Sequence, residues 1–139
     1  MLENMIEITP KPISPQLLID KVKTDSSGCV VAYIGLIRDH SRGKQVASVE
    51  YSDAQGNAGE RLLDIANEVK QKWQVNNIAI CHRIGKLKVG DINLVVAVSA
   101  AHRKEGFAAC QHIIDRFKQA IPTHKKETYQ DGSIWVEGE

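Results

Sequence analysis

The sequence predicts an α+β domain with a largely antiparallel or mixed sheet, for three reasons. A length of 139 residues fits one domain with its own hydrophobic core. Strand-like apolar runs are interleaved with amphipathic helical stretches, in an order that includes candidate hairpins. No internal repeat or obvious linker interrupts them, so residues 1–139 are expected to form a single domain.

The first elements are a short helix and a strand. Ser14 followed by Pro15 is typical of an N-cap and a first helical position, and the helix should end near Lys23. Residues 29–37 are apolar and rich in β-branched side chains, which predicts a strand. Gly35 inside this run indicates a bulge or the close approach of another group.

A hairpin is expected next. Residues 38–44 form a polar turn, and residues 45–51 alternate between apolar and polar types as the returning strand would. A loop over residues 52–58 then precedes residues 59–73, where apolar side chains recur at the spacing of one helical face.

The second half contains the most apolar strand. Residues 76–84 predict a strand, and residues 92–99 predict the central one, after a turn at residues 89–91. This strand leads directly into a helix that continues to about Gln119. Its expected buried stripe consists of Phe107, Cys110, Ile114 and Phe117.

The chain is expected to end in a hairpin. Pro122 stops the helix, and residues 127–129 and 134–136 predict two short strands. The intervening residues 130–132, Gln-Asp-Gly, are a hairpin turn signal.

Composition excludes several classes of function. The net charge of +1 argues against a protein that coats nucleic acid. No apolar run approaches the roughly 20 residues that span a bilayer, and no signal peptide is recognisable, so a cytoplasmic protein is expected. Three cysteines at long spacings (Cys29, Cys81 and Cys110) give no zinc pattern; we expect buried, reduced thiols and no metal site.

The segment 115–127 carries a local surplus of positive charge and is a candidate anion site. Taken alone, Lys118 has a simpler interpretation, because a lysine near a helix C-terminus interacts favourably with the helix dipole. The four cations and two anions of the segment give a local charge of +2: Arg116, Lys118, Lys125 and Lys126 against Asp115 and Glu127.

Two further positions are candidate anion contacts. His102 and Arg103 open the long helix, where unpaired N–H groups and the dipole favour anions, although a solvated first turn is the alternative. Arg38 follows the strand over residues 29–37 and is either a binding residue or a solvated residue at a strand end.

Six sequence landmarks occur in a fixed order and together resemble the large, catalytic subunit of molybdopterin synthase. Each fragment is short, so the specificity lies in their order and spacing over about residues 6–136. They are Gly-Cys-Val-Val-Ala-Tyr-Ile-Gly-Leu-Ile-Arg-Asp-His at 28–40, His-Arg-Ile-Gly at 82–85, Val-Ser-Ala-Ala-His-Arg at 98–103, Lys118, Pro-Thr-His-Lys-Lys-Glu at 122–127, and Asp-Gly-Ser-Ile-Trp-Val at 131–136.

The resemblance implies a fold and a reaction. The fold is an α/β hammerhead core with an additional small antiparallel sheet. The reaction is a step of molybdenum cofactor biosynthesis, in which sulfur from the C-terminal thiocarboxylate of a small ubiquitin-like subunit forms the dithiolene of molybdopterin. The substrate is cyclic pyranopterin monophosphate (precursor Z), and no separate cofactor is implied. The partner's Gly-Gly tail enters the large subunit, and a homodimer of large subunits lies within a heterotetramer.

The resemblance also implies the site. Lys118 and Lys125 match the two essential lysines of the family, and they would divide proton transfer and charge stabilisation between them. The residues that match its substrate-binding positions are Leu36, Ile37, Arg38, His102, Arg103, Lys118, Lys125, Lys126 and Glu127. The chain departs from the family pattern at His124, where the family often has Trp, and in the loop over residues 52–58.

The length of the long helix adds a geometric expectation. His102 and Lys118 are 16 residues apart, which at ~1.5 Å per residue is roughly 24 Å along a helix. A small pterin cannot contact both, so a shared site would combine Lys118 and Lys125 of one chain with His102 and Arg103 of a second copy. Two alternatives to catalysis stay open: a module that binds a phosphorylated metabolite, and an inactive structural subunit.

Overall fold

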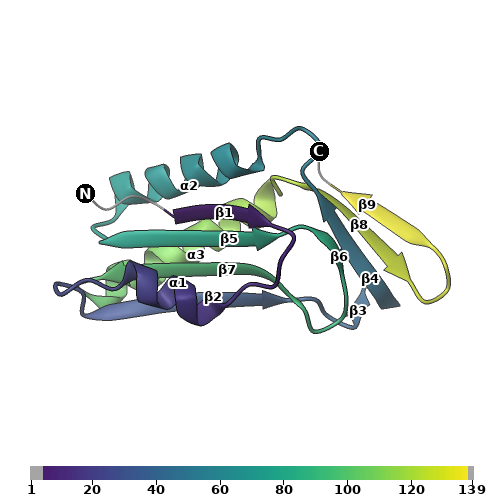
Figure 1. Ribbon diagram of the computed structural model, residues 1–139, viewed down its shortest axis with the longest axis horizontal. Helices are drawn as coiled ribbons and strands as arrows, with labels where there is room; N and C mark the ends of the chain where they lie inside the picture. The colour runs from purple at the N-terminus through teal and green to yellow at the C-terminus, as the bar shows by residue number, and fades with distance from the viewer. Residues whose placement is uncertain (1–4, 138–139) are drawn as a thin grey trace.

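The structure is a computed structural model that describes residues 5–137, and it contains two β-sheets and three helices over that range (Figure 1). The elements, in chain order, are β1 (Met5–Thr9), α1 (Pro15–Val22), β2 (Cys29–Leu36), β3 (His40–Ser41), β4 (Lys44–Ser52), α2 (Ala58–Lys72), β5 (Asn77–Arg83), β6 (Gly85–Leu87), β7 (Ile92–Ala100), α3 (Arg103–Gln119), β8 (His124–Tyr129) and β9 (Ile134–Glu137).

The first sheet has four strands in the order β1-β5-β7-β2. Its β1–β5 pair is parallel and the other two pairs are antiparallel, so the sheet is mixed. Helices α2 and α3 cover one face and α1 packs on the other, which gives the sheet a hydrophobic core on each side (Figure 1). The prediction that residues 92–99 form a central strand is confirmed, because β7 lies between β5 and β2.

The second sheet is small and entirely antiparallel. Strands β3, β4, β8 and β9 pair in that order, and β6 also pairs with β4. A third apolar cluster, which includes Ile37, Val49, Leu87 and Tyr129, packs under it. The fold class expected from the sequence, an α+β core with an additional antiparallel sheet, is confirmed.

Local signals explain several element boundaries. The Ser14 hydroxyl accepts a hydrogen bond from the backbone N–H of Leu17 (3.4 Å), as expected for an N-cap before Pro15. The β2–β7 pairing shifts register between Gly35 and Leu36, so the predicted bulge is confirmed. A Cβ atom on residue 35 would lie only 2.9 Å from Oδ1 of Asn93, so any larger residue would require the Asn93 side chain to move.

Three expectations need correction. No strand is predicted before the first helix, yet β1 forms there by pairing with β5. Residues 45–51 do not return along the strand at 29–37, because β2 pairs with β7 whereas β4 joins the second sheet, where it pairs with β6 and β8 and forms a local hairpin with the two-residue β3. Phe107 is 61% exposed and not part of the buried stripe of α3.

The packing of α3 explains the exposure of Phe107. The face of α3 that meets the first sheet includes Gly106 and Ala109, together with the expected Cys110 and Phe117. A Cβ on Gly106 would lie 3.1 Å from the Val31 side chain, so the helix approaches β2 through its smallest residue. Ile114, also expected in the stripe, is only partly buried.

No helix within residues 5–137 is long and apolar enough to cross a membrane.

Candidate active site

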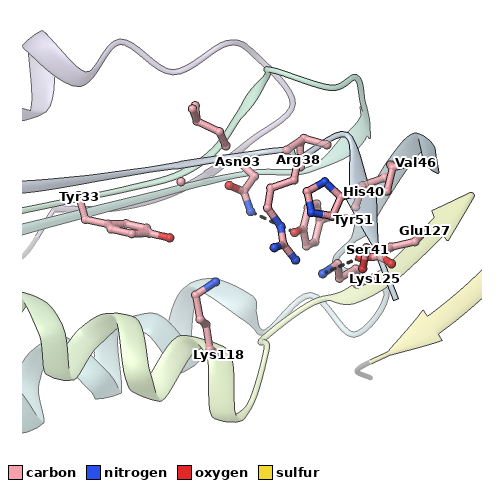
Figure 2. Close-up of a pocket in the computed structure, with 14 residues that line it drawn as sticks. Tyr33, Arg38, His40, Ser41, Val46, Tyr51, Asn93, Lys118, Lys125 and Glu127 are labelled. Carbon is pink, nitrogen blue, oxygen red and sulfur yellow. Dashed lines mark hydrogen bonds and ion pairs between the residues drawn. The ribbon is translucent and has the colours of Figure 1, made fainter. Parts of the chain in front are cut away.

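A pocket lies where the ends of β2 and α3 meet the second sheet (Figure 2). It brings together six of the nine residues expected at the site, namely Leu36, Ile37, Arg38, Lys118, Lys125 and Glu127. The remaining lining residues are Tyr33, Gly35, His40, Ser41, Val46, Val49, Tyr51 and Asn93.

Lys118 enters the pocket from the last turn of α3. The neighbouring Phe117 is buried in the core, which fixes the rotation of the helix and leaves Lys118 on the exposed side. Figure 2 shows its side chain rising toward the end of the first sheet, opposite Arg38 and Asn93. Among residues 5–137 its amine has no hydrogen-bond or ion-pair partner, so it is available to a ligand.

Lys125 is held in place by a buried carboxylate. Its amine lies 3.2 Å from Oε2 of Glu127, two residues further along β8 and on the same face of the strand. The hydroxyl of Tyr129 donates to the other oxygen, Oε1, at 2.6 Å. Burial raises the pKa of Glu127, but the hydrogen bonds from Tyr129 and Lys125 outweigh it and bring that pKa below its ordinary value of 4.5. Glu127 is therefore an anion at neutral pH.

Tyr51 and Asn93 form a polar wall that the sequence does not single out. The amide Nδ2 of Asn93 donates to the hydroxyl oxygen of Tyr51 at 3.0 Å. Burial raises the pKa of Tyr51 to about 12, so its hydroxyl stays protonated. The two residues come from β7 and β4, and their bond joins the two sheets at the pocket.

The strand end that carries Arg38 is rigid. Both backbone polar groups of Ile37 are hydrogen-bonded: its N–H donates to the carbonyl of Asp91, and its carbonyl accepts from the N–H of Gly90. The side chain of Arg38 is exposed and faces the pocket (Figure 2). Between residues 5 and 137 it has no hydrogen bond or ion pair, as for Lys118. Two uncommitted cations thus face the same space.

Three expected site residues lie elsewhere in this chain. His102 and Arg103 are at the start of α3 and border a separate hollow beside Gly28 and Cys29. Lys126 is exposed and points to the opposite side of β8 from Lys125 and Glu127, as the alternation of a strand requires. The helix-length expectation therefore agrees with the structure: one chain does not bring His102 to Lys118.

No group of His, Cys, Asp or Glu side chains within the described range is arranged to hold a metal ion. The cysteines are free thiols and none lines the pocket. Cys81 and Cys110 are buried as expected, and burial raises their pKa values to about 12 and about 11. Cys29 is only half-buried.

The fold and this site define a class of protein. It is an α+β protein whose pocket presents Arg38, Lys118 and Lys125 together with tyrosine and asparagine hydrogen-bonding groups. Arg38 and Lys118, which have no ion-pair partner among the described residues, are suited to an anionic ligand such as a phosphate ester or a carboxylate.

The chain belongs to the MoaE protein family, whose model matches residues 8–120. It is 38% identical over 130 residues to the molybdopterin synthase catalytic subunit of Bacillus subtilis, covering 94% of this chain and 83% of that protein. It is 39% identical to the molybdopterin synthase catalytic subunit of a Nostoc species, covering 97% of this chain and 83% of that protein.

Solved structures show the same fold. Molybdopterin synthase from Staphylococcus aureus superposes with a TM-score of 0.87 at 32% identity, covering 96% of this chain and 97% of that chain. A complex of subunits 1 and 2 of the molybdopterin-converting factor from Helicobacter pylori gives a TM-score of 0.69 at 13% identity, covering 94% of this chain and 86% of that chain. This likeness concerns the fold alone.

Proposed function

We propose that this chain is the catalytic subunit of a molybdopterin synthase and acts in molybdenum cofactor biosynthesis. It transfers sulfur from the C-terminal thiocarboxylate of a small ubiquitin-like partner to cyclic pyranopterin monophosphate. The observation that carries the proposal is the convergence of Lys118, Lys125 and Arg38 on one pocket in a member of the MoaE family.

The pocket suits the charge of this substrate. A cyclic phosphate is an anion, and a free Arg38 guanidinium can contact two of its oxygens at once. The pterin supplies ring nitrogens and a carbonyl, for which the hydroxyl of Tyr51 and the amide of Asn93 are complementary partners. The lining offers little apolar surface, as a polar substrate requires.

The proposed transfer has two parts. The thiocarboxylate sulfur forms a bond to an oxygen-bearing side-chain carbon of the substrate while the C–O bond at that carbon breaks and its oxygen leaves with a proton, which produces a thioester between substrate and partner. Water then cleaves the acyl C–S bond, so the sulfur stays on the substrate and the partner leaves as a carboxylate. The first part needs proton transfer at the substrate, and the second develops negative charge on the acyl oxygen.

The environments of the two lysines support different roles. Lys118 is exposed and has no partner among the described residues, so its amine can move to a reacting group and exchange a proton. Lys125 is oriented by Glu127 at 3.2 Å, which fixes a cation where charge develops. We assign proton transfer to Lys118 and charge stabilisation to Lys125.

The proposed partner is a small subunit with a Gly-Gly tail. Its extended C-terminus would bring the thiocarboxylate to the pocket, since no cysteine of this chain lines the pocket to carry sulfur itself. The Helicobacter pylori structure is a complex of two different subunits, and we propose the same kind of pairing here, within a heterotetramer.

We further propose that a second copy of this chain completes the site. His102 and Arg103 open the 17-residue helix α3, whereas Lys118 lies at its other end. Strand β2 is an edge of the first sheet, with outward apolar side chains at Ile34 and Leu36. A two-fold axis beside β2 would pair it with its copy. The two α3 helices would then run antiparallel, with His102 and Arg103 of the second copy near Lys118.

Two general features complete the proposal. Residues 1–139 act as one domain, because the pocket is built from both sheets and neither sheet alone contains Lys118, Lys125 and Arg38. The location is the cytoplasm, since free thiols at Cys29, Cys81 and Cys110 fit a reducing compartment.

Reconstitution tests the proposed reaction. The purified chain is mixed with a thiocarboxylated small subunit and cyclic pyranopterin monophosphate, and molybdopterin is detected by fluorescence of its oxidised derivative. We expect product only when all three components are present. If the substrate binds and no product forms at any protein concentration, the chain is a binding module or an inactive subunit instead.

A further inference from the structure

The most deeply buried histidine of the described chain, His82 on β5, has no part in the chemistry proposed above. Its side chain is 0% exposed and lies between the two sheets, behind the pocket. The ring packs edge-on against Tyr51 at 4.8 Å and against Phe117 at 5.1 Å, measured between ring centroids. A histidine in such a place must have both ring nitrogens satisfied or lose stability.

Both nitrogens have partners, and these partners fix the tautomer. Nδ1 lies 2.9 Å from the backbone carbonyl of Asn93, which can only accept, so Nδ1 carries the hydrogen. Burial lowers the pKa of His82, so the ring is neutral and Nε2 has a free lone pair. Nε2 therefore accepts from the hydroxyl of Thr123 at 3.0 Å, and that residue is itself buried.

The contacts of His82 involve both segments that carry a proposed catalytic lysine, α3 and the connection that leads into β8. Phe117 precedes Lys118 on α3, and Thr123 lies two residues before Lys125 in the connection from α3 to β8. On the other side of the ring, Asn93 donates from its side chain to the hydroxyl of Tyr51, a lining residue. The hydrogen bonds of His82 with Thr123 and with the Asn93 carbonyl are thus linked, through the covalent structure of Asn93, to the bond between its side chain and Tyr51.

We propose that His82 and Thr123 are positioning residues that set the separation of the Lys118 and Lys125 amines. The connection between the two lysines contains only residues 120–123 outside α3 and β8, so anchoring Thr123 limits where β8 can start relative to the end of α3. A misplacement of ~1 Å at a reacting group can cost about 10²-fold in rate, so this anchor affects catalysis without touching the substrate. The proposal rests on the proposed function for its kinetic readout.

The test removes the hydrogen bond between Thr123 and His82 while keeping the shape of the side chain at position 123. Thr123→Val deletes the hydroxyl that donates a hydrogen bond to Nε2 of His82 and keeps the branched side chain, whereas Thr123→Ser keeps the hydroxyl and serves as the conservative control. In the reconstituted sulfur transfer, we expect Thr123→Val to lower kcat by about tenfold or more, with KM for the substrate changed less than about twofold, and Thr123→Ser to retain most of the wild-type kcat. A wild-type kcat in Thr123→Val would overturn the proposal. So would equal losses of kcat in both variants.

A second measurement does not depend on activity. In 15N spectra of histidine-labelled protein, we expect the His82 ring as the neutral tautomer with hydrogen on Nδ1. In protein with 13C-labelled lysine, the side-chain signals of Lys118 and Lys125 should shift in Thr123→Val and return in Thr123→Ser. Unchanged lysine signals in a folded Thr123→Val, or hydrogen on Nε2, would refute the positioning role. If the wild-type protein makes no product, the proposed reaction is wrong, and the spectra still decide the role of His82.

Discussion

The two lysines of the pocket show how one residue type is given two environments. Lys125 is paired with Glu127, whose carboxylate is held in turn by Tyr129, so this cation is fixed before any ligand arrives. Lys118 extends from a helix end and has no partner among residues 5–137. The neighbouring residues thus hold Lys125 in one orientation and leave Lys118 free to move. Single substitutions can alter either environment.

Gly35 allows the pocket wall to pack closely. A Cβ at this position would lie 2.9 Å from Oδ1 of Asn93 and 3.1 Å from the ring of Tyr33. We expect Gly35→Ala to lower the free energy of unfolding by about 1–3 kcal/mol, as for other overpacked sites. Urea denaturation measures the change.

Gly59→Ala is the matched control for Gly35→Ala. Gly59 lies in the first turn of α2, and apart from its chain neighbours and the nearby backbone of α2 no described atom is within 4 Å of its added Cβ. Alanine is the better helix former, so this variant should be as stable as wild type or up to about 1 kcal/mol more stable. Equal stabilities for the two variants would show that the wall at Gly35 accommodates a methyl group.

At the scale of elements, a cluster of charged side chains ties α2 to the half of α3 that carries Lys118. The carboxylate of Glu68 on α2 accepts from Nε2 of His112 at 2.5 Å and from Nη1 of Arg116. The ring of Trp73 packs on His112 at 5.1 Å. The position of the end of α3 therefore depends on α2 as well as on the first sheet.

The contribution of Glu68 to stability should depend on pH. The hydrogen bonds from His112 and Arg116 lower the pKa of Glu68 below its ordinary 4.5. For a lowered carboxyl pKa, the stabilisation is fully present above the ordinary value and is lost as pH falls through the folded-state value. Glu68→Gln should therefore lower Tm at pH 7, and the difference from wild type should shrink as the pH is lowered below 4.5.

Asp64→Asn is the control, because this carboxylate is exposed on the same helix. It should leave Tm at pH 7 nearly unchanged. A Tm difference between wild type and Glu68→Gln that stays constant down to acidic pH would show that the effect of Glu68 is packing and not charge.

Elements with strong local signals could be predicted from the sequence, and elements defined by distant partners could not. The run at residues 92–99 is long and apolar on both faces, so its central place was predictable. Strand β1 has only five residues and forms by parallel pairing with β5, some 70 residues away, so nothing local identifies it. Likewise, alternation at residues 45–51 predicts a strand but cannot say which sheet it joins.

The same limit applies to the site. Lys118, Lys125 and Arg38 were predicted because charge and the family landmarks mark them, and the structure places all three at one pocket. Tyr51 and Asn93 were not predicted, because their role depends on a hydrogen bond between the two sheets. His102 and Arg103 were predicted for the same site, but in this chain they border a separate hollow.

At the scale of the whole molecule, the two ends of α3 should serve two different pockets. Lys118→Ala should inactivate a pocket through the C-terminal end of α3, and Arg103→Ala should do so through the N-terminal end of α3 in the second copy. Each homodimer should be inactive at both sites. A mixed dimer should regain activity, because one of its two pockets contains an intact Lys118 and an intact Arg103.

Subunit exchange between the two variants tests this expectation. At equal mixing, half of the dimers are heterodimers, and each has one intact pocket of two. The mixture should therefore reach about one quarter of wild-type activity if exchange is complete and random. Activity that stays at the level of the separate variants, with exchange verified by differently tagged chains, would place both residues in a pocket of one chain or exclude Arg103 from catalysis.

The most direct test of the account is the single-turnover rate of Lys118→Ala in the reconstituted sulfur transfer. Lys72→Ala is the control, since this exposed lysine lies at the end of α2 away from the pocket. We expect Lys118→Ala to be slower than wild type by roughly 10²–10⁴-fold, the range for loss of a general acid–base group, and Lys72→Ala to match wild type. If the rate of Lys118→Ala is within about threefold of wild type, the loss of rate is far smaller than that range. This result would contradict the assignment of sulfur transfer to this pocket.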